Sequence, residues 1–306
     1  MINRDLIRIK TIQLVYSYYQ NPDRTIASTE KELLFSLSKS YDMYRYLLML
    51  IVKVYDYGVK DLELQRSRAA RLKLQEDINT RFADNRFARQ LAENKELNAF
   101  AKNAGADVMD ETIIKKLYKA VIGSDVYREY MELDNVDYAA DSRFWRRAYK
   151  TCFATCADID TMFEDKSLYW NDDRAVVDSF VVKTIKKFKE EYGADQPLLP
   201  EYDTDEDREF AVKLIHATLT NEAEYRGLIA ENAKKWEISR MALMDVVITQ
   251  TAIAEIFTFP SIPVAVTISE YLDLANAYST PKSHIYINGL LDFIVKKLRE
   301  EGVIMK

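Results

Sequence analysis

Glycine and proline are scarce in this sequence, which holds seven glycines and six prolines in 306 residues. Turns and β-bulges depend on these two residue types, so their scarcity favours helices joined by few loops. Neither residue occurs from Val59 to Ala104 or from Ser124 to Tyr192. Hydrophobic residues make up 48% of the chain, which is enough to build a sizeable core. We therefore expect an all-α protein.

Charge and the ends of the chain narrow the class of protein further. The net charge of −6, with both signs interspersed, argues against global attraction to nucleic acid but allows a local basic patch. The N-terminal "MINRDLIRIK" lacks the apolar segment of a signal peptide, and no apolar run is long enough to span a bilayer. The two cysteines fit a reducing compartment. We expect a cytoplasmic protein without a membrane partner.

The N-terminal segment, residues 1–58, contains two expected helices. In residues 4–20 the apolar side chains recur at steps of three and four, which predicts the first helix. Pro22 ends it, because the residue before a proline disfavours the helical conformation. A second helix is expected from about Ser28 to Tyr57.

The central segment, residues 59–195, differs in composition from its neighbours. Residues 59–103 are rich in charge and poor in large apolar side chains, but most are good helix formers, which indicates exposed helices. Residues 107–192 are expected to be helical around aromatic anchors. The break "GADQPLLPEY" at 193–202 contains one glycine and two prolines. This composition separates the segment from the C-terminal segment, residues 196–306.

The C-terminal segment is also predicted to be helical. Thr204 is a suitable N-cap for one helix, and further helices are expected over 222–234, 239–257 and 264–278. Asn-Gly within "SHIYINGLLD" at 283–292 is a hairpin signal, but the apolar residues around it step by three and four and favour a helix. Glycine inside a helix costs about 1 kcal/mol. We expect a close helix–helix approach at Gly289 to explain it.

Two sets of residues give the chain a family likeness. Thr11, Gln13 and Tyr16 match an Ala-x-Gln-x-x-Tyr pattern that follows an arginine-rich first turn. The C-terminal landmarks are Trp236, Arg240, Asp245, Glu255, Ile262-Pro263, Glu270 in "TISEYLDLA", Ser283 and "YINGLLD" at 286–292. With these residues in this order, the chain resembles the transcription antitermination factor NusB. Members of that family are usually about half this length, so residues 59–195 would be a helical insertion.

The resemblance implies a fold of two packed helical subdomains and a function without a catalytic reaction. It implies binding of a boxA-like single-stranded RNA through the N-terminal helix and pairing with the small-subunit ribosomal protein that acts as NusE. Such a complex would join the transcription elongation complex on nascent ribosomal RNA. A helical protein-interaction scaffold that kept the fold but lost RNA binding is the alternative.

Arg4, Arg8 and Lys10 in the first turns of the N-terminal helix are the first candidates for RNA binding. Their charges can neutralise backbone phosphates. From the residues alone a solvated helix face is the more common explanation, whereas the resemblance favours contact with RNA. Asp5 and Leu6 stand where family members often carry further arginines, which thins this cluster.

The resemblance adds Lys282 and Tyr286, at the start of the last helix, to the RNA surface. Lysine replaces an acidic residue that is common at position 282, and a tyrosine can stack on an unpaired base. Tyr16 and Asp245 match positions at or near the NusE interface. The alternatives are that Tyr286 is a half-buried aromatic, Tyr16 a core residue and Asp245 a helix N-terminal charge. Gln250 stands where the family often has an arginine.

The central segment offers an arginine series that could form a second binding arm, although a solvated face is the simpler explanation: Arg66, Arg68, Arg71, Arg81, Arg86 and Arg89. Cys152 and Cys156 lie four apart on a predicted helix, where we expect buried reduced thiols. A structural metal site needs four ligands, so we expect no metal and no cofactor. No phosphate-binding loop, nucleophile elbow or HExxH motif is present, which argues against an enzyme.

Overall fold

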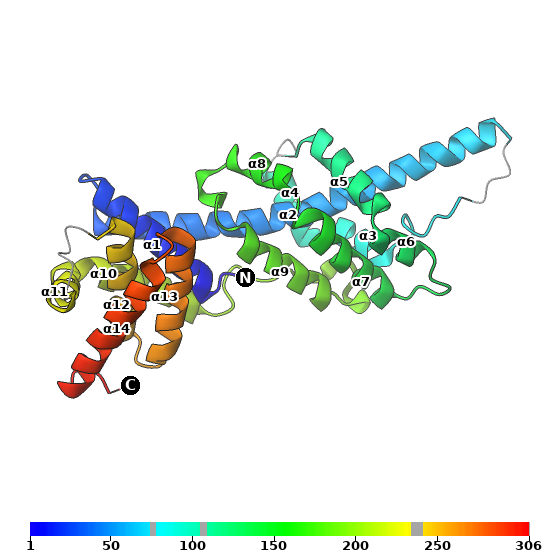
Figure 1. Cartoon of the computed structure of the whole chain (residues 1–306). Helices are drawn as coiled ribbons and strands as arrows, with labels where there is room; N and C mark the ends of the chain where they lie inside the picture. Colours follow the sequence, from blue (N-terminus) through cyan, green and yellow to red (C-terminus); the bar gives the residue numbers. More distant parts are fainter. Residues whose placement is uncertain (74–77, 105–108, 234–240, 306) are drawn as a thin grey trace. The chain divides into compact units, whose positions relative to one another are not determined.

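The structure is a computed structural model that describes residues 1–73, 78–104, 109–233 and 241–305 (Figure 1). In these residues the backbone is mainly helical, and the one β-type pairing recorded is an isolated bridge between Ile2 and Tyr202. The predicted all-α class is therefore confirmed. The landmarks Trp236 and Arg240 lie outside the described residues. No helix in the described ranges has the length and apolar character needed to cross a membrane.

The chain forms two compact units. Unit 1 comprises Met1 and residues 39–201, and unit 2 comprises residues 2–38 and 202–306. The limits of these units at 38/39 and 201/202 do not coincide with the segments 1–58, 59–195 and 196–306. Those three segments were defined to separate the helices that resemble the family from the insertion. Their bounds stay a prediction.

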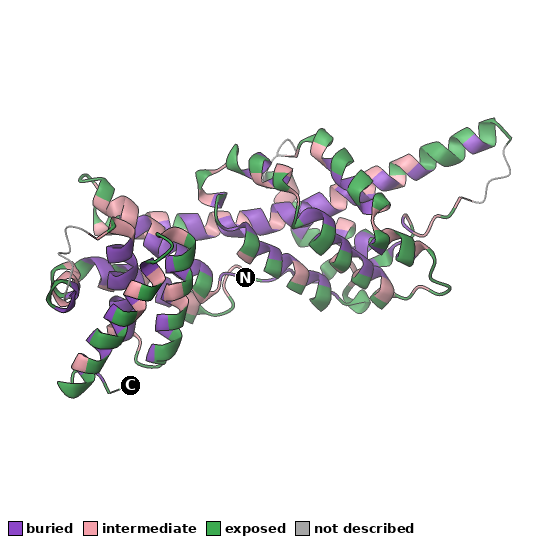
Figure 2. Ribbon diagram, in the orientation of Figure 1, coloured by how far each residue is buried: buried purple, intermediate pink, exposed green. Residues whose placement is uncertain are grey.

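Unit 2 is built around α12 (Leu243–Thr258), which packs against five other helices. These are α1 (Arg4–Gln20), α10 (Asp205–Thr220), α11 (Glu222–Asn232), α13 (Val264–Tyr278) and α14 (Ser283–Glu300). Every residue from Leu6 to Ile12 of α1 and from Asp245 to Ile256 of α12 is buried. Because these stretches are buried on all sides, their polar side chains need partners inside the core. Figure 2 shows the burial along the ribbon.

The structure confirms the helices predicted over 4–20, 264–278 and the "SHIYINGLLD" stretch, which opens α14. The explanation offered for Gly289 is wrong. Gly289 is exposed, and a Cβ added there would meet nothing within 4 Å beyond its own helix backbone and chain neighbours. Thr204 does occupy the N-cap position of α10, but its side chain accepts no capping hydrogen bond.

Unit 1 is a helical cluster around the longer part of α2 (Ile26–Arg71). Its other elements are α3 (Arg86–Glu93), α4 (Lys95–Ala104), α5 (Glu111–Gly123), α6 (Asp125–Met131), α7 (Tyr138–Ala148), the π-helical turn η2 (Tyr149–Phe153), α8 (Ala157–Glu164), η3 (Leu168–Trp170), α9 (Arg174–Lys187) and η4 (Glu190–Asp195). Aromatic rings fill its core. A Cβ on Gly58 would lie 2.8 Å from Cε2 of Tyr118 and still closer to the ring of Phe82. The glycine that a close approach requires is therefore Gly58.

Two sequence expectations in unit 1 need correction. The second helix was expected to end near Tyr57, but α2 continues unbroken to Arg71. Most side chains of α2 after Leu62 are exposed. The change in composition therefore marks the point where α2 is no longer packed against other helices, and not the end of the helix. Cys152 is buried in η2, whereas Cys156 is half-buried at the N-cap of α8. The expectation of a buried thiol is therefore confirmed for Cys152 and wrong for Cys156.

Candidate nucleic-acid interface

Arg8 lies in the core of unit 2, with 4% of its side chain exposed. Its Nε and Nη2 each donate to the carboxylate of Glu255 at 2.9 Å, which is the bidentate geometry of a strong ion pair. Nη1 also donates to Glu270 at 3.2 Å. Burial alone lowers the pKa of the guanidinium, but the hydrogen bonds and charge of Glu255 outweigh it and raise that pKa. This corrects the expectation of an exposed Arg8.

The carboxylate of Glu255 is fully buried and receives two further hydrogen bonds. Thr267 Oγ1 donates at 2.9 Å and the hydroxyl of Tyr271 at 3.1 Å, both from α13. Burial, and then the charge of Glu255, raises the pKa of Tyr271 well above its ordinary value. Four donors from two helices thus meet one carboxylate on α12. This buried carboxylate thus joins α1, α12 and α13, and all four of its donors would lose their partner if it were removed.

The other two cations predicted for the first turns of α1 have different surroundings. Lys10 is only 3% exposed, so it too departs from the expected solvated position. The side chain of Arg4 is 40% exposed, with Nε 3.8 Å from Oδ1 of Asp207. Its guanidinium carbon lies 5.1 Å from the ring centre of Phe210. Arg4 is therefore the candidate of these three that can reach a ligand.

Lys282 and Tyr286 lie together at the start of α14. Lys282 occupies the N-cap position and is exposed. Tyr286 is half-buried, and its hydroxyl lies 3.7 Å from the sulfur of Met241. Burial and then the charge of Asp245 raise the pKa of Tyr286. This corner therefore combines an exposed cation with an aromatic ring that keeps part of its surface open.

Asp245, a candidate for partner binding, is buried at this same corner. Its carboxylate accepts hydrogen bonds from the hydroxyls of Ser283, at 3.0 Å, and Ser279. It therefore ties the first turn of α12 to the start of α14. Tyr16, the other candidate, is half-buried on α1.

The structure separates the predicted RNA-binding residues into two groups. Arg8 is fixed at Glu255, and Arg4 lies one turn before it on α1. Lys282 and Tyr286 adjoin the other end of α12, at Asp245. Ten residues of helix separate Glu255 from Asp245, which corresponds to about 15 Å. The two groups can therefore contact different nucleotides.

A guanidinium lies beside Gln250, but it is supplied by a different helix. Gln250 is fully buried and donates to the hydroxyl of Tyr19 and the carbonyl of Thr218, both at 2.7 Å. Arg226 Nε donates to its amide oxygen at 3.1 Å and lies 4.0 Å over the ring of Tyr19. The arginine from α11 thus occupies the region where the family often has one on α12.

The six arginines of the central segment divide into two sets. Arg81 donates to the carbonyl of Tyr130 at 3.0 Å, and Arg86 and Arg89 form ion pairs inside unit 1. The other three, Arg66, Arg68 and Arg71, are exposed at the end of α2. Half of the series therefore has partners within unit 1, which weakens the prediction of a single arginine-rich arm.

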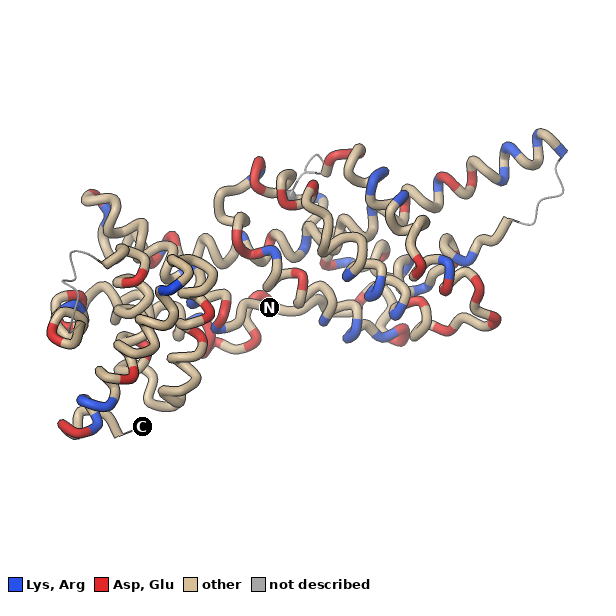
Figure 3. The backbone as a smooth tube through the Cα atoms, viewed as in Figure 1, with Lys and Arg blue, Asp and Glu red and all other residues tan. Residues whose placement is uncertain are grey.

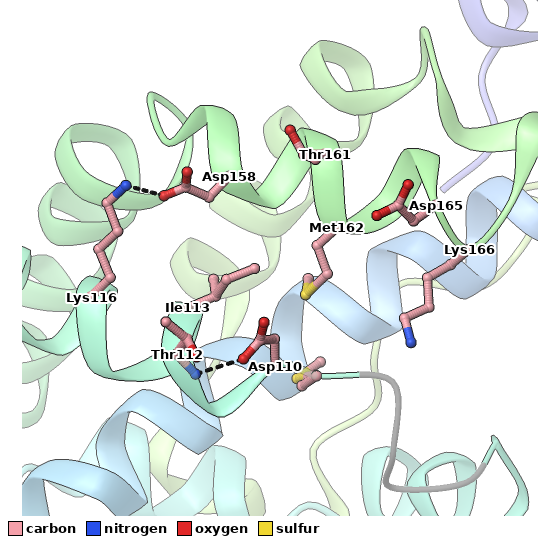
Figure 4. Close-up of a pocket in the computed structure, with 10 residues that line it drawn as sticks. Asp110, Thr112, Ile113, Lys116, Asp158, Thr161, Met162, Asp165 and Lys166 are labelled. Carbon is pink, nitrogen blue, oxygen red and sulfur yellow. Dashed lines mark hydrogen bonds and ion pairs between the residues drawn. The ribbon is translucent and has the colours of Figure 1, made fainter.

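A cavity of about 600 Å³ lies in unit 1 beside α5 and α8 (Figure 4). Its charged groups are partly engaged, since Lys116 pairs with Asp158 and Asp110 caps the backbone of Thr112 at 2.7 Å. The ten lining residues include no histidine, cysteine or serine. Within the described part of the chain, no group of three or more histidine, cysteine or acidic side chains is placed to hold a metal ion.

Comparison with known proteins identifies the family. The profile of the NusB family matches residues 180–296. The "Transcription antitermination protein NusB" of Salinibacter ruber is 34% identical over 132 residues, which cover 41% of this chain and 82% of that protein. The protein of the same name from Elusimicrobium minutum is 40% identical over 95 residues, covering 31% of this chain and 67% of that protein. No solved structure matched the chain.

Other relatives are covered less completely. The protein from Chloroherpeton thalassium is 34% identical over 99 residues, which cover 32% of this chain and 47% of that relative. The profile match begins in α9 and ends in α14, so it includes the end of unit 1 as well as the C-terminal helices of unit 2. On the identity to the Salinibacter ruber protein and its coverage, the chain belongs to the NusB family.

Proposed function

We propose that this protein is an RNA-binding transcription antitermination factor, without a catalytic reaction of its own. It acts with NusE on boxA-like elements of nascent ribosomal RNA, as part of the transcription elongation complex in the cytoplasm. The observation that carries the proposal is the 34% identity to a transcription antitermination protein of which 82% is covered.

The proposed RNA surface consists of Arg4, Lys282 and Tyr286. Arg4 and Lys282 contact phosphates, and Tyr286 stacks on an unpaired base, a contact worth about 1–3 kcal/mol. The exposure of Lys282 and the 40% exposed side chain of Arg4 support these roles. Arg8 is left out because its guanidinium is already bound to the buried carboxylate of Glu255. For NusE, Tyr16 and the α12–α14 corner at Asp245 remain the proposed contact.

The test is binding of the full chain to a boxA-like RNA and to a scrambled RNA of equal length, with and without NusE. We expect a preference for the boxA-like RNA that NusE strengthens. Arg4→Gln and Lys282→Gln should each lower the slope of log Kd against log salt by about 0.7. Lys296→Gln, which removes one exposed charge further along α14, is the control.

The scaffold alternative rests on one observation, the burial of Arg8 and Lys10. It takes two of the three cations predicted on α1 away from the surface. A scaffold would bind NusE but would bind neither the boxA-like RNA nor the scrambled RNA. That result would overturn RNA binding and leave the protein-interaction function in its place.

A further inference from the structure

Six cations line the exposed side of α7, η2 and α9 in unit 1. They form what we call the basic face, and they are Arg143, Arg146, Lys150, Lys183, Lys186 and Lys187. Arg146 is half-exposed and the other five are exposed. Figure 3 shows the blue positions along these helices.

The packing of α7 against α9 brings these cations onto one side. Ser142 Oγ donates to the carbonyl of Ile185 at 2.9 Å near the start of α7, and the hydroxyl of Tyr149 donates to Asp178 after its end. The two helices are therefore antiparallel. Positions 143, 146 and 150 follow one another at steps of three and four, and positions 186 and 187 lie three and four residues after 183. Each set therefore shares a stripe beside the contact. The small side chains of Ala175 and Ser179 continue the α9 stripe.

The elements α7, η2 and α9 themselves contribute no exposed negative charge to this side. The acidic residues of α7, η2 and α9 are Asp141 and Asp178, which are 2% and 8% exposed. The acids that follow α9 are engaged, since Glu190 pairs with Arg86 at 3.0 Å and Glu191 with Lys189. In the described ranges none of the six cations forms an ion pair. A chain with a net charge of −6 thus concentrates six unpaired positive charges on one surface.

Ordinary helix electrostatics do not explain the whole basic face. Cations in the last turn of a helix are favoured by its dipole, which accounts for Lys186 and Lys187 on α9. The antiparallel packing places that end of α9 beside the first half of α7, where Arg143 has no such benefit. Solvated helix faces normally alternate both signs of charge, whereas this one carries a single sign. Like charges repel each other here unless a polyanion neutralises them.

We propose that the basic face binds the phosphate backbone of RNA without reading its sequence. It would be a second RNA contact, on the unit that does not contain Arg4, Lys282 and Tyr286. The inference rests on the proposed function only in taking RNA as the polyanion. Guanidinium and ammonium groups suit phosphate oxygens, and each neutralised phosphate releases a counterion, so the contact must depend on salt.

The experiment measures binding of the full chain to a short oligouridylate, which contains no boxA, over a range of salt concentrations. The variant Arg143→Gln/Lys186→Gln removes one cation from each helix of the basic face. The matched control Lys115→Gln/Lys119→Gln removes two exposed cations from α5 in the same unit. We expect the first variant to lower the slope of log Kd against log salt by about 1.4, and the control to leave it unchanged.

An unchanged slope in Arg143→Gln/Lys186→Gln, or an equal change in the control, would overturn the proposal. All four side chains are exposed, so unfolding curves matching the unsubstituted protein should confirm intact variants. A parallel titration with boxA-like RNA keeps the two proposals apart. The basic-face variant should weaken binding to both RNAs by the same factor and leave the preference intact. A missing boxA preference in the unsubstituted protein would overturn the proposed function alone.

Discussion

Replacing Arg8 with methionine tests whether the cation on α1 is a structural group. The change removes two hydrogen bonds of 2.9 Å from a carboxylate that has no exposed surface. Thr267 and Tyr271 would still donate to Glu255, so the carboxylate keeps two of its four donors. Methionine fills much of the space of the arginine stem, so the loss is mainly electrostatic.

The expected cost is large because a buried charge loses its partner. Removing one member of a buried ion pair typically costs about 3–5 kcal/mol, and two charge-assisted hydrogen bonds at about 1.5–3 kcal/mol each give a similar figure. The double variant Arg8→Met/Glu255→Gln removes the uncompensated charge. It should recover at least about 1 kcal/mol of the loss, since Thr267 and Tyr271 can still donate to the amide oxygen.

Hydrogen exchange of amides in α1 and α12 is the suitable assay, because it reports the stability of unit 2 separately from unit 1. Arg4→Met is the matched control on the same helix. Its partner Asp207 is 3.8 Å away and its side chain is 40% exposed, so we expect a loss below about 1 kcal/mol. Equal losses for the two arginines would refute the structural role of Arg8. So would a double variant no more stable than Arg8→Met.

Three further predictions concern stability. Burial, and then the like charge of Asp5, raises the pKa of Glu270, so the folded protein gains stability as the pH falls through that pKa. Glu270→Gln should therefore be more stable than the unsubstituted protein at neutral pH in urea unfolding, with a difference that closes below pH 4.5. Gly58→Ala should cost about 1–3 kcal/mol by overpacking, whereas Gly289→Ala should gain about 0.5–1 kcal/mol; thermal melts giving both the same sign would contradict this. Asp245→Asn should cost about 1–3 kcal/mol and speed exchange at the start of α14, and unchanged exchange there would argue against the serine contacts.

In unit 2 the sequence predicted the positions of the helices better than the burial and the partners of their side chains. The periodicity of residues 4–20 gave α1 its correct bounds, because local spacing is what determines a helix stripe. It could not show that Arg8 is buried, since the compensating Glu255 lies 247 residues further along the chain. Glu255 was recognised as a landmark, but its pairing with Arg8 depends on three-dimensional packing.

In unit 1 the sequence indicated which residues favour a helix, but it did not indicate which helices pack against one another. Good helix formers after Tyr57 predicted helix correctly, but whether they continued α2 or began a new helix depended on tertiary contacts. The basic face was missed for a similar reason. Arg143 and Lys186 lie far apart in sequence, and only the antiparallel packing of α7 on α9 shows that their charges gather on one side.

The order of the segments in unit 2 has a consequence for biosynthesis. Its N-terminal part, residues 2–38, is synthesised before the whole of unit 1, and its remainder comes last. At about 5–20 residues per second, roughly 12–50 s pass between the synthesis of Arg8 and that of Glu255. For most of that time α1 lacks both α10 and α12, the two helices that pack against it in the finished protein. A nascent chain stalled before α10 should therefore present this helix to chaperones and proteases.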